Sequence, residues 1–295
     1  MPLSPEARLA ASAGIASSTV AAVLVALKLW ALGATGALSI AASLADSGVD
    51  LMVSLAALLA ILYAARPPDE DHAFGHTSAE DLAALGQALF VTVTAVVIGW
   101  AAALRLLAPA ATPLRDEGSG IVVMVVSTLL TVALLAWQNR VIRRTGSKVV
   151  AADALHYAGD LVFNIGAILS LVASRWLGLM QIDSVMALVA ALILIAGALR
   201  VGRSAWDALM DRTADPEISA GIARIAATWP GVRGFHDIKT RTAGSRVFVQ
   251  IHIELDGNQP LREAHDIGAA LRRAIIAAYP QADVIVHKDV ARGPD

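Results

Sequence analysis

Long apolar stretches alternate with short polar gaps over most of the chain, and from about residue 211 the sequence becomes an ordinary mixture of polar and apolar residues. A membrane-spanning helix needs about 20 mostly apolar residues to cross a hydrocarbon core of about 30 Å. Six stretches are long enough, over roughly residues 9–32, 38–63, 80–107, 119–142, 149–174 and 182–205. The pattern therefore predicts an α-helical membrane domain of six transmembrane helices over residues 1–210, and a separate domain over residues 211–295.

The second domain has the pattern of a small α/β unit with the element order αββαβ. Its second predicted strand alternates apolar and polar residues, which is typical of a sheet with one buried face. The two helices would cover that face, and the other face would meet solvent or a partner. The expected elements are a helix over 215–228, strands over 234–242 and 246–255, a helix over 260–279 and a strand over 283–289.

Composition excludes several classes of protein. The chain is 57% hydrophobic and only 16% charged, whereas soluble domains carry about 25% charged residues, so a disordered protein and an ordinary soluble enzyme are both excluded. A net charge of −2 gives no electrostatic footprint for nucleic acid. Cysteine is absent, which removes disulfides, thiolate metal sites and thiol catalysis. Any metal site must use histidine, aspartate and glutamate.

Basic residues in the short loops predict the orientation, because they accumulate on the cytoplasmic side of a membrane. Eight lie at the N-terminus, after the second and fourth spans and at the exit of the sixth, while the opposite loops hold two, and one more lies near a boundary. Both termini and the C-terminal domain are therefore expected in the cytoplasm. The eight are Arg8, Arg66, Arg140, Arg143, Arg144, Lys148, Arg200 and Arg203.

Four ionisable residues fall inside predicted spans, where charge is costly. Asp46 and Asp50 are separated by four positions, so both lie on one face of a helix, and His156 and Asp160 repeat that spacing. At 1.5 Å per residue, the aspartates of the second span lie about 12 and 18 Å from the outer edge, and His156 and Asp160 lie about 10 and 17 Å from the inner edge. In a core of about 30 Å the two pairs reach overlapping depth, so they can meet.

Three carboxylates and one imidazole form a four-coordinate shell suited to Zn²⁺. The absence of thiolate disfavours Cu(I), and the imidazole disfavours Ca²⁺ and Mg²⁺, which leaves Fe²⁺, Cd²⁺, Co²⁺ and Mn²⁺ as alternatives. A simpler interpretation pairs these groups with one another or with Ser43, Ser47 and Asn164, but it leaves negative charge that favours a bound cation. Asp153, one turn before His156, is expected to be solvated or to line the site.

The loop after the second span carries a second acidic and histidine-containing cluster. His72 and His76 would chelate an ion if the stretch is helical, with Asp69 or Asp71 as a third ligand. The alternative is a solvated acidic loop whose histidines only cap it or form hydrogen bonds.

Four of the seven histidines lie in the C-terminal domain, at His236, His252, His265 and His287. His287 and Asp289 share a strand face by the period of two, and His252 lies on the polar face of its own strand. This density of ligands favours a metal site, provided that the fold brings the residues together.

Three segments carry a likeness to a known family: SLADSGVDLMVSLAALLA (43–60), DEDHAFGHTSAEDLAALGQALF (69–90) and ALHYAGDLVFNIGA (154–167). With the six spans and the histidine-bearing αββαβ tail, they resemble the cation diffusion facilitator family, in particular its bacterial zinc and ferrous-iron efflux pumps. The resemblance covers nearly the whole chain. It implies a homodimer, not an enzyme, that exports divalent metal from the cytoplasm across the inner membrane in exchange for protons.

The resemblance also implies three groups of ligands, the last in a metallochaperone-like domain that dimerises. These are a transport site of Asp46, Asp50, His156 and Asp160, a loop site of Asp69, His72 and His76, and a two-metal cytoplasmic site of His236, His252, His265, His287 and Asp289.

This chain departs from the family pattern at one position. It has Ser78 where these pumps often carry a lysine, although Asp211 keeps the position of the usual acidic partner, which puts a charge interlock at the dimer hinge in doubt. Lys288 lies between two proposed ligands and is expected to point away from them by strand alternation.

The expected function is Zn²⁺ efflux by metal/proton antiport with alternating access. Because ligands must lose protons to bind metal, the two cations compete, and His156 is the expected exchange residue. A passive divalent-metal channel and a metal-sensing membrane receptor are the nearer alternatives. An intramembrane aspartyl protease, using Asp46 or Asp50 with Asp160, would leave the histidines without a role.

Overall fold

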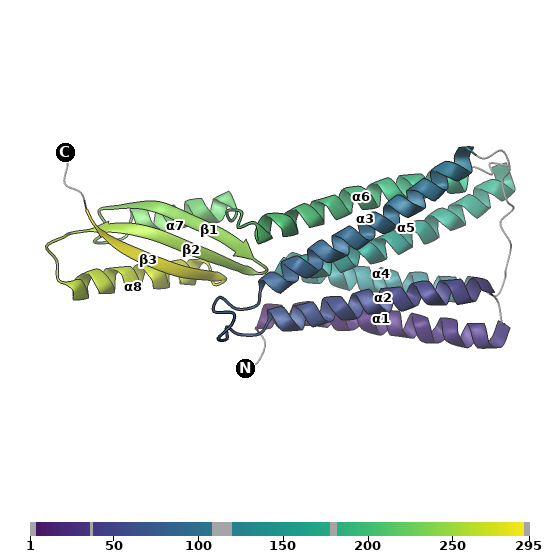
Figure 1. Cartoon of the computed structure of the whole chain (residues 1–295), viewed down its shortest axis with the longest axis horizontal. Coiled ribbons are helices and arrows are strands. Elements are labelled where there is room, and N and C mark those ends of the chain that lie inside the picture. The colour runs from purple at the N-terminus through teal and green to yellow at the C-terminus, as the bar shows by residue number, and fades with distance from the viewer. Residues whose placement is uncertain (1–3, 36–37, 108–119, 178–181, 292–295) are drawn as a thin grey trace. The chain divides into compact units, whose positions relative to one another are not determined.

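A computed structural model describes residues 4–35, 38–107, 120–177 and 182–291 (Figure 1). The chain divides into two compact units, Met1–Trp206 and Asp207–Asp295. The first is helical and the second is an α/β domain, as the hydrophobic pattern predicts. The helices of the first unit are α1 (Pro5–Thr35), α2 (Leu38–Ala64), α3 (Ser78–Leu107), α4 (Gly120–Thr145), α5 (Lys148–Leu177) and α6 (Ile182–Leu209).

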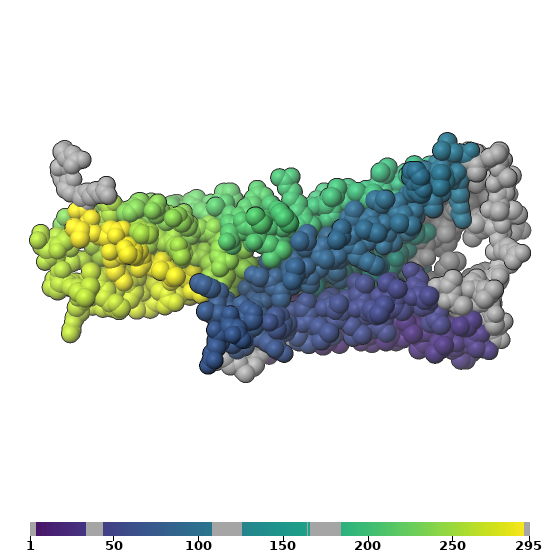
Figure 2. Space-filling view, in the orientation of Figure 1, coloured from purple at the N-terminus to yellow at the C-terminus, as the bar shows by residue number. Residues whose placement is uncertain are grey.

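The six long helices coincide with the six predicted apolar stretches. Within the described residues, four of them, α1, α2, α3 and α6, are long and apolar enough to cross a membrane. The prediction of a helical membrane domain is confirmed, while the structure supports four of the six predicted spans by length and composition. The loop between α2 and α3 projects from one end of this helical unit (Figures 1 and 2).

Glycines on α5 and α6 leave room for a leucine of the opposite helix, and small residues are common at the contacts between membrane helices. A Cβ on Gly159 of α5 would lie 2.9 Å from Leu194 Cδ1 of α6, and a Cβ on Gly197 of α6 would lie 2.7 Å from Leu155 Cδ1 of α5. Each helix thus accepts a leucine of the other in a glycine notch. This reciprocal packing fixes the segment of α5 that carries His156.

Asp153 is buried, with 2% of its surface exposed, so it is not solvated, and it is not among the residues that line the cavity of the predicted membrane site. Gln138 Nε2 of α4 donates to Asp153 Oδ2 at 2.7 Å, and Ser54 Oγ of α2 donates to Oδ1 at 3.4 Å. Ser54 also lies 3.0 Å from the Tyr157 hydroxyl. Helix periodicity alone did not reveal these neutral partners, because they come from two other helices.

The second unit has the predicted αββαβ order. Its elements are α7 (Pro216–Ala227), β1 (Gly234–Ala243), β2 (Arg246–Leu255), α8 (Leu261–Ala278) and β3 (Ala282–Val290). The sheet order is β1-β2-β3, with β1 antiparallel to β2 and β2 parallel to β3, so α8 forms the crossover that a parallel pair requires. The side chain of Asp215 caps α7 by accepting from the Glu217 backbone N–H at 2.8 Å.

Alternation along β2 separates a dry face of the sheet from an open face. Ile251 and Ile253 are fully buried against Ile222 of α7 and against Leu271 and Ile275 of α8. The intervening residues of β2 are partly or fully exposed. The helices therefore cover one face only, and polar side chains are left free to gather on the other.

Candidate metal centres

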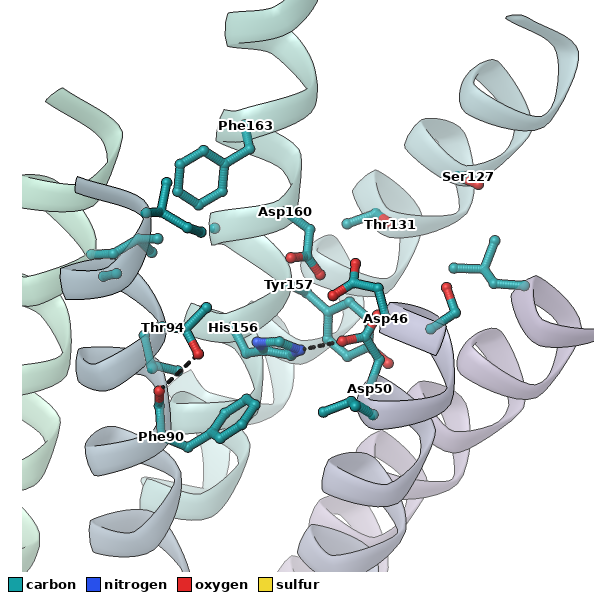
Figure 3. A pocket seen from close by; sticks show the side chains of 18 of the residues that line it. Asp46, Asp50, Phe90, Thr94, Ser127, Thr131, His156, Tyr157, Asp160 and Phe163 are labelled. Carbon is teal, nitrogen blue, oxygen red and sulfur yellow. Dashed lines mark hydrogen bonds and ion pairs between the residues drawn. The ribbon is translucent and has the colours of Figure 1, made fainter. Parts of the chain in front are cut away.

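The first candidate centre lies between α2 and α5, where His156 Nε2 is 2.8 Å from Asp50 Oδ1. One ligand atom each from Asp50, His156 and Asp160 lie within 4.8 Å of one another. Asp46 lies outside that group but lines the same cavity, and Figure 3 shows its side chain pointing toward Asp160. The structure thus brings three of the four predicted ligands together and places the fourth beside them.

These residues line a cavity of about 340 Å³ with walls from α1, α3, α4 and α6. The Phe90 ring meets the edge of the His156 ring, with 6.0 Å between centroids, and the Thr94 hydroxyl donates to the Phe90 carbonyl at 3.0 Å (Figure 3). The proton of the Thr94 hydroxyl is therefore used within its own helix. The carboxylates and the imidazole that could bind a metal ion come from α2 and α5.

Lys28 of α1 also lines the cavity, which the sequence argument did not anticipate. Its Nζ donates to Ser47 Oγ at 2.6 Å. Ser47 thus accepts a hydrogen bond from a lysine, while the pairing of ionisable groups with one another, which the simpler interpretation also allowed, is present between His156 and Asp50. The side chains of Ser43 and Asn164, named in that interpretation, lie outside the described part of the structure.

The second candidate centre is the loop cluster, in which a single carboxylate meets two histidines. Asp69 Oδ1 lies 3.2 Å from His72 Nδ1, and Asp69 Oδ2 lies 3.1 Å from His76 Nε2. The stretch is a turn, not a helix: Gly75, at φ +83°, donates its N–H to the His72 carbonyl at 2.9 Å, and α3 begins only at Ser78. The helix on which chelation was conditional is absent from this stretch, but the turn brings the same two histidines together.

Hydrogen bonds preorganise this cluster. The backbone N–H groups of His72 and Asp71 donate to Asp69 Oδ1 at 2.7 and 3.1 Å. The bond from the His72 backbone N–H is the main cause that lowers the pKa of Asp69. His76 is 5% exposed, and among the described residues its Nδ1 has no hydrogen-bond partner. Of the two proposed carboxylates, the turn places Asp69, not Asp71, at the histidines.

The third candidate centre lies on the open face of the C-terminal sheet, around Asp289. Asp289 Oδ2 lies 2.9 Å from His252 Nδ1 and 3.4 Å from His236 Nε2, while Oδ1 lies 3.1 Å from His287 Nε2. The hydrogen bond from His252 is the main cause that lowers the pKa of Asp289. One carboxylate oxygen therefore meets two histidines and the other meets a third, a geometry suited to a carboxylate bridging two ions.

A β-bulge brings His236 into this cluster. His236 pairs with His252 and Lys239 pairs with Gln250, so β1 uses one extra residue between them, and Asp237 there adopts φ +48°. If β1 paired regularly through this point, His236 would lie opposite Ile253 and strand alternation would turn it to the helix-covered face. The bulge therefore interrupts the period of two of a regular strand just where it keeps His236 on the open face.

His265 and Lys288 both lie away from this cluster. His265 is exposed on α8, the helix that covers the other face of the sheet, and it does not join the cluster formed by the described residues of one chain. Lys288 lies over Gly268 of α8, where a Cβ would meet its Cε at 2.5 Å, so it points away from the cluster. Glu254, which shares the polar face of β2 with His252, lies 3.2 Å from His236 Nδ1 and was not predicted as a site residue.

Asp211 has a partner within the C-terminal unit. Arg241 Nη1 of β1 lies 3.0 Å from Asp211 Oδ1, and the Arg241 guanidinium lies over the Phe248 ring at 4.5 Å. Asp211 itself adopts φ +55°. The acidic position that this chain keeps, despite having Ser78 in place of lysine, is engaged by an arginine of the same domain.

Comparison with known proteins gives consistent matches over both units. One family model, the cation efflux transmembrane domain, matches residues 14–210, and a second, the cytoplasmic domain of cation efflux proteins, matches residues 214–290. The cation-efflux pumps FieF of Escherichia coli and of Escherichia fergusonii are each 40% identical over 282 residues, which cover 96% of this chain and 93% of the relative. A solved metal-bound C-terminal domain of the CzcD transporter from Thermotoga maritima is 23% identical, covering 25% of this chain and 87% of that chain, with a TM-score of 0.24.

Proposed function

The chain belongs to the cation-efflux family of multi-pass membrane transporters, which are not enzymes, and on that premise we propose that it exports divalent metal ions from the cytoplasm in exchange for protons. Zn²⁺ is the proposed main substrate. The observation that carries the proposal is the convergence of Asp50, His156 and Asp160 in one cavity between α2 and α5. Asp46, at the same cavity, would supply a fourth ligand.

The ligand chemistry supports zinc. Three carboxylates and one imidazole nitrogen match the four-coordinate oxygen and nitrogen sites that bind Zn²⁺. Fe²⁺, Cd²⁺, Co²⁺ and Mn²⁺ accept overlapping donor sets, so they are the competitors that a transport assay must include.

The hydrogen bond between His156 Nε2 and Asp50 Oδ1 supports proton coupling. It uses the two atoms that would bind an ion, so a proton shared by this pair and a metal ion exclude each other. A helix pair that opens alternately to the two sides of the membrane would then carry metal outward and protons inward.

The remaining architecture is proposed on the same premise. The membrane domain would extend over residues 1–210 with six spans in the inner membrane, and both termini would face the cytoplasm, as the loop charges predict. The domain of residues 211–295 would bind metal at its His236–His252–His287–Asp289 cluster and hold two chains together as a homodimer. Because His265 does not join that cluster on its own chain, it would serve as a ligand only through a second copy.

The direct test is zinc uptake into reconstituted vesicles with an imposed pH gradient. Uptake of zinc should accelerate when protons can leave the vesicles down their gradient, in the direction opposite to the metal. It should slow when an ionophore collapses the pH gradient. Uptake that ignores the gradient would contradict antiport and favour a passive channel, and zinc binding without any flux would favour a metal-sensing receptor. Competition by Fe²⁺, Cd²⁺, Co²⁺ and Mn²⁺ in the same assay orders the substrates.

A further inference from the structure

His236 lies between two carboxylates, one at each ring nitrogen. Its Nδ1 is 3.2 Å from Glu254 Oε1, and its Nε2 is 3.4 Å from Asp289 Oδ2. Nε2 faces Asp289 and, beyond it, His252, so it is the nitrogen placed to bind an ion. A neutral ring that binds an ion through Nε2 carries its proton on Nδ1, and the Glu254 carboxylate, which can only accept a hydrogen bond, lies beside that atom.

The backbone leaves space for the Glu254 side chain. Gly234 pairs with Glu254 across the β1–β2 ladder, two residues before His236 pairs with His252. A Cβ on Gly234 would lie 2.7 Å from Glu254 Oε2. An alanine at this position would therefore push the carboxylate away from its present place, since a carboxylate oxygen cannot approach a methyl group that closely.

At the β-bulge, strand pairing alone does not fix the orientation of the His236 ring. His236 is the last regularly paired residue before the extra residue of β1, and its side chain is about half exposed. Strand pairing places the ring on the open face but leaves its rotation about the side-chain bonds to its hydrogen-bond partners. Among the contacts described for His236, Glu254 is the one at the nitrogen that faces away from Asp289.

We propose that Glu254 is a positioning residue of the C-terminal metal site, which holds the Nδ1–H of His236 and thereby presents Nε2 to the ion bound beside Asp289. The inference rests on the proposed metal binding by this domain. Outer carboxylates that orient metal-binding histidines recur in metal sites, and their removal costs about 10–100-fold in metal affinity. In this domain, the absence of a side chain at Gly234 leaves room for the Glu254 carboxylate.

Zinc titration of the full chain in detergent, against a chelating dye, tests this proposal. The background carries Asp50→Ala and His76→Ala, so that binding reports mainly the C-terminal cluster. Glu254→Ala and Gly234→Ala should each lower zinc affinity by about 10–100-fold. Glu254→Gln, which keeps an acceptor oxygen for Nδ1–H, should retain most of the affinity. Gln250→Ala, an exposed change on the same strand and face, is the matched control and should bind like the background.

Histidine-selective ¹⁵N NMR supplies a readout that general loosening of the domain would not move. His236 Nδ1 should give the signal of a protonated ring nitrogen in the background chain, and should become a mixture of tautomers in Glu254→Ala. Unchanged affinity and unchanged tautomer in Glu254→Ala would overturn the proposal. So would an equal loss in Glu254→Gln and Glu254→Ala, because that result would make Glu254 a direct ligand.

If Glu254→Ala fails to fold, Gly234→Ala and Glu254→Gln still decide the matter through the same two readouts. All measurements are made at equilibrium without a gradient. A result that overturns the role of Glu254 therefore leaves the transport proposal intact. A chain that binds zinc with the help of Glu254 but moves no zinc across vesicle membranes would contradict the proposed function alone.

Discussion

His156 of α5 and Asp50 of α2 share a hydrogen bond of 2.8 Å, which joins the two helices inside the cavity that they line with Asp160. If an ion replaces that bond during transport, neither residue can be dispensed with. Asp50→Ala and His156→Ala should each reduce zinc flux into reconstituted vesicles to the level of protein-free vesicles, while the protein keeps the elution volume of the wild type in size-exclusion chromatography.

Thr94→Val is the control for this prediction. Thr94 lines the same cavity, but its hydroxyl is neutral, donates within its own helix to the Phe90 carbonyl, and is not one of the proposed ligands. This variant should keep most of the flux. Wild-type flux in Asp50→Ala or His156→Ala would refute the proposed transport site.

The loop cluster should depend on Asp69 over a wide pH range. Its pKa is lowered mainly by the backbone N–H of His72, so its carboxylate stabilises the folded loop at every pH above the unfolded value of about 3.9, and this stabilisation is lost only as pH falls through the lower folded pKa. Protection of the Asp71 and His72 amides against hydrogen exchange, corrected for intrinsic rates, should therefore change little from about pH 7 to about pH 5.

Asp69→Ala should remove that protection throughout the same range and weaken zinc binding by the loop. The matched change is Asp71→Ala, because Asp71 contacts Asp69 through its backbone and should tolerate loss of its side chain. Equal effects of the two substitutions would contradict the assignment of Asp69 as the carboxylate of this cluster.

His287 should matter for the response to metal more than for transport itself. It contacts Asp289 Oδ1, on the opposite oxygen from His236 and His252. His287→Ala should raise the zinc concentration needed for half-maximal stimulation by about tenfold, with a smaller change in flux at low zinc. Lys288→Ala, one residue along but pointing toward Gly268, provides the comparison. A uniform loss of flux at low and high zinc would argue against a regulatory role.

Removing one partner of the ion pair between α3 and α5 should strongly destabilise the fold. Lys148 Nζ lies 2.7 Å from Asp81 Oδ1, and the Asp81 side chain is almost fully buried. Lys148→Met leaves a buried carboxylate without this partner and should lower the free energy of unfolding by about 3–5 kcal/mol. Thermal unfolding in detergent measures the effect. The double variant with Asp81→Leu should regain most of the loss, and a double variant as unstable as the single one would contradict this account.

The sequence predicted more of the membrane site than of the other two candidate centres. Two pairs at i and i+4 and a rise of 1.5 Å per residue were enough to predict that Asp50, His156 and Asp160 lie near one another. The partners that bury Asp153 were not predictable in this way. Ser54 and Gln138 are ordinary polar residues of other helices, and only the packing of those helices brings them to the carboxylate.

In the loop and the sheet, the sequence did not predict the backbone conformation that brings the side chains together. The i, i+4 spacing of His72 and His76 suggested a helix, yet a turn with Gly75 in the left-handed region brings the same side chains together. In β1, a regular period of two would have turned His236 inward, and nothing in the local alternation marks Asp237 as the irregular residue. Spacing therefore predicted which of these side chains meet more reliably than it predicted the backbone that carries them.

The residue that β1 sets opposite His252 decides which side chains the open face of the sheet presents. Regular pairing of the present sequence would set Asp237 opposite His252 and His236 opposite Ile253, which would bury this histidine and expose Phe235. Deleting one residue at Asp237 or Ile238 would instead restore a regular ladder with His236 still opposite His252. The composition of the open face thus depends on the pairing of the strand and not on its length.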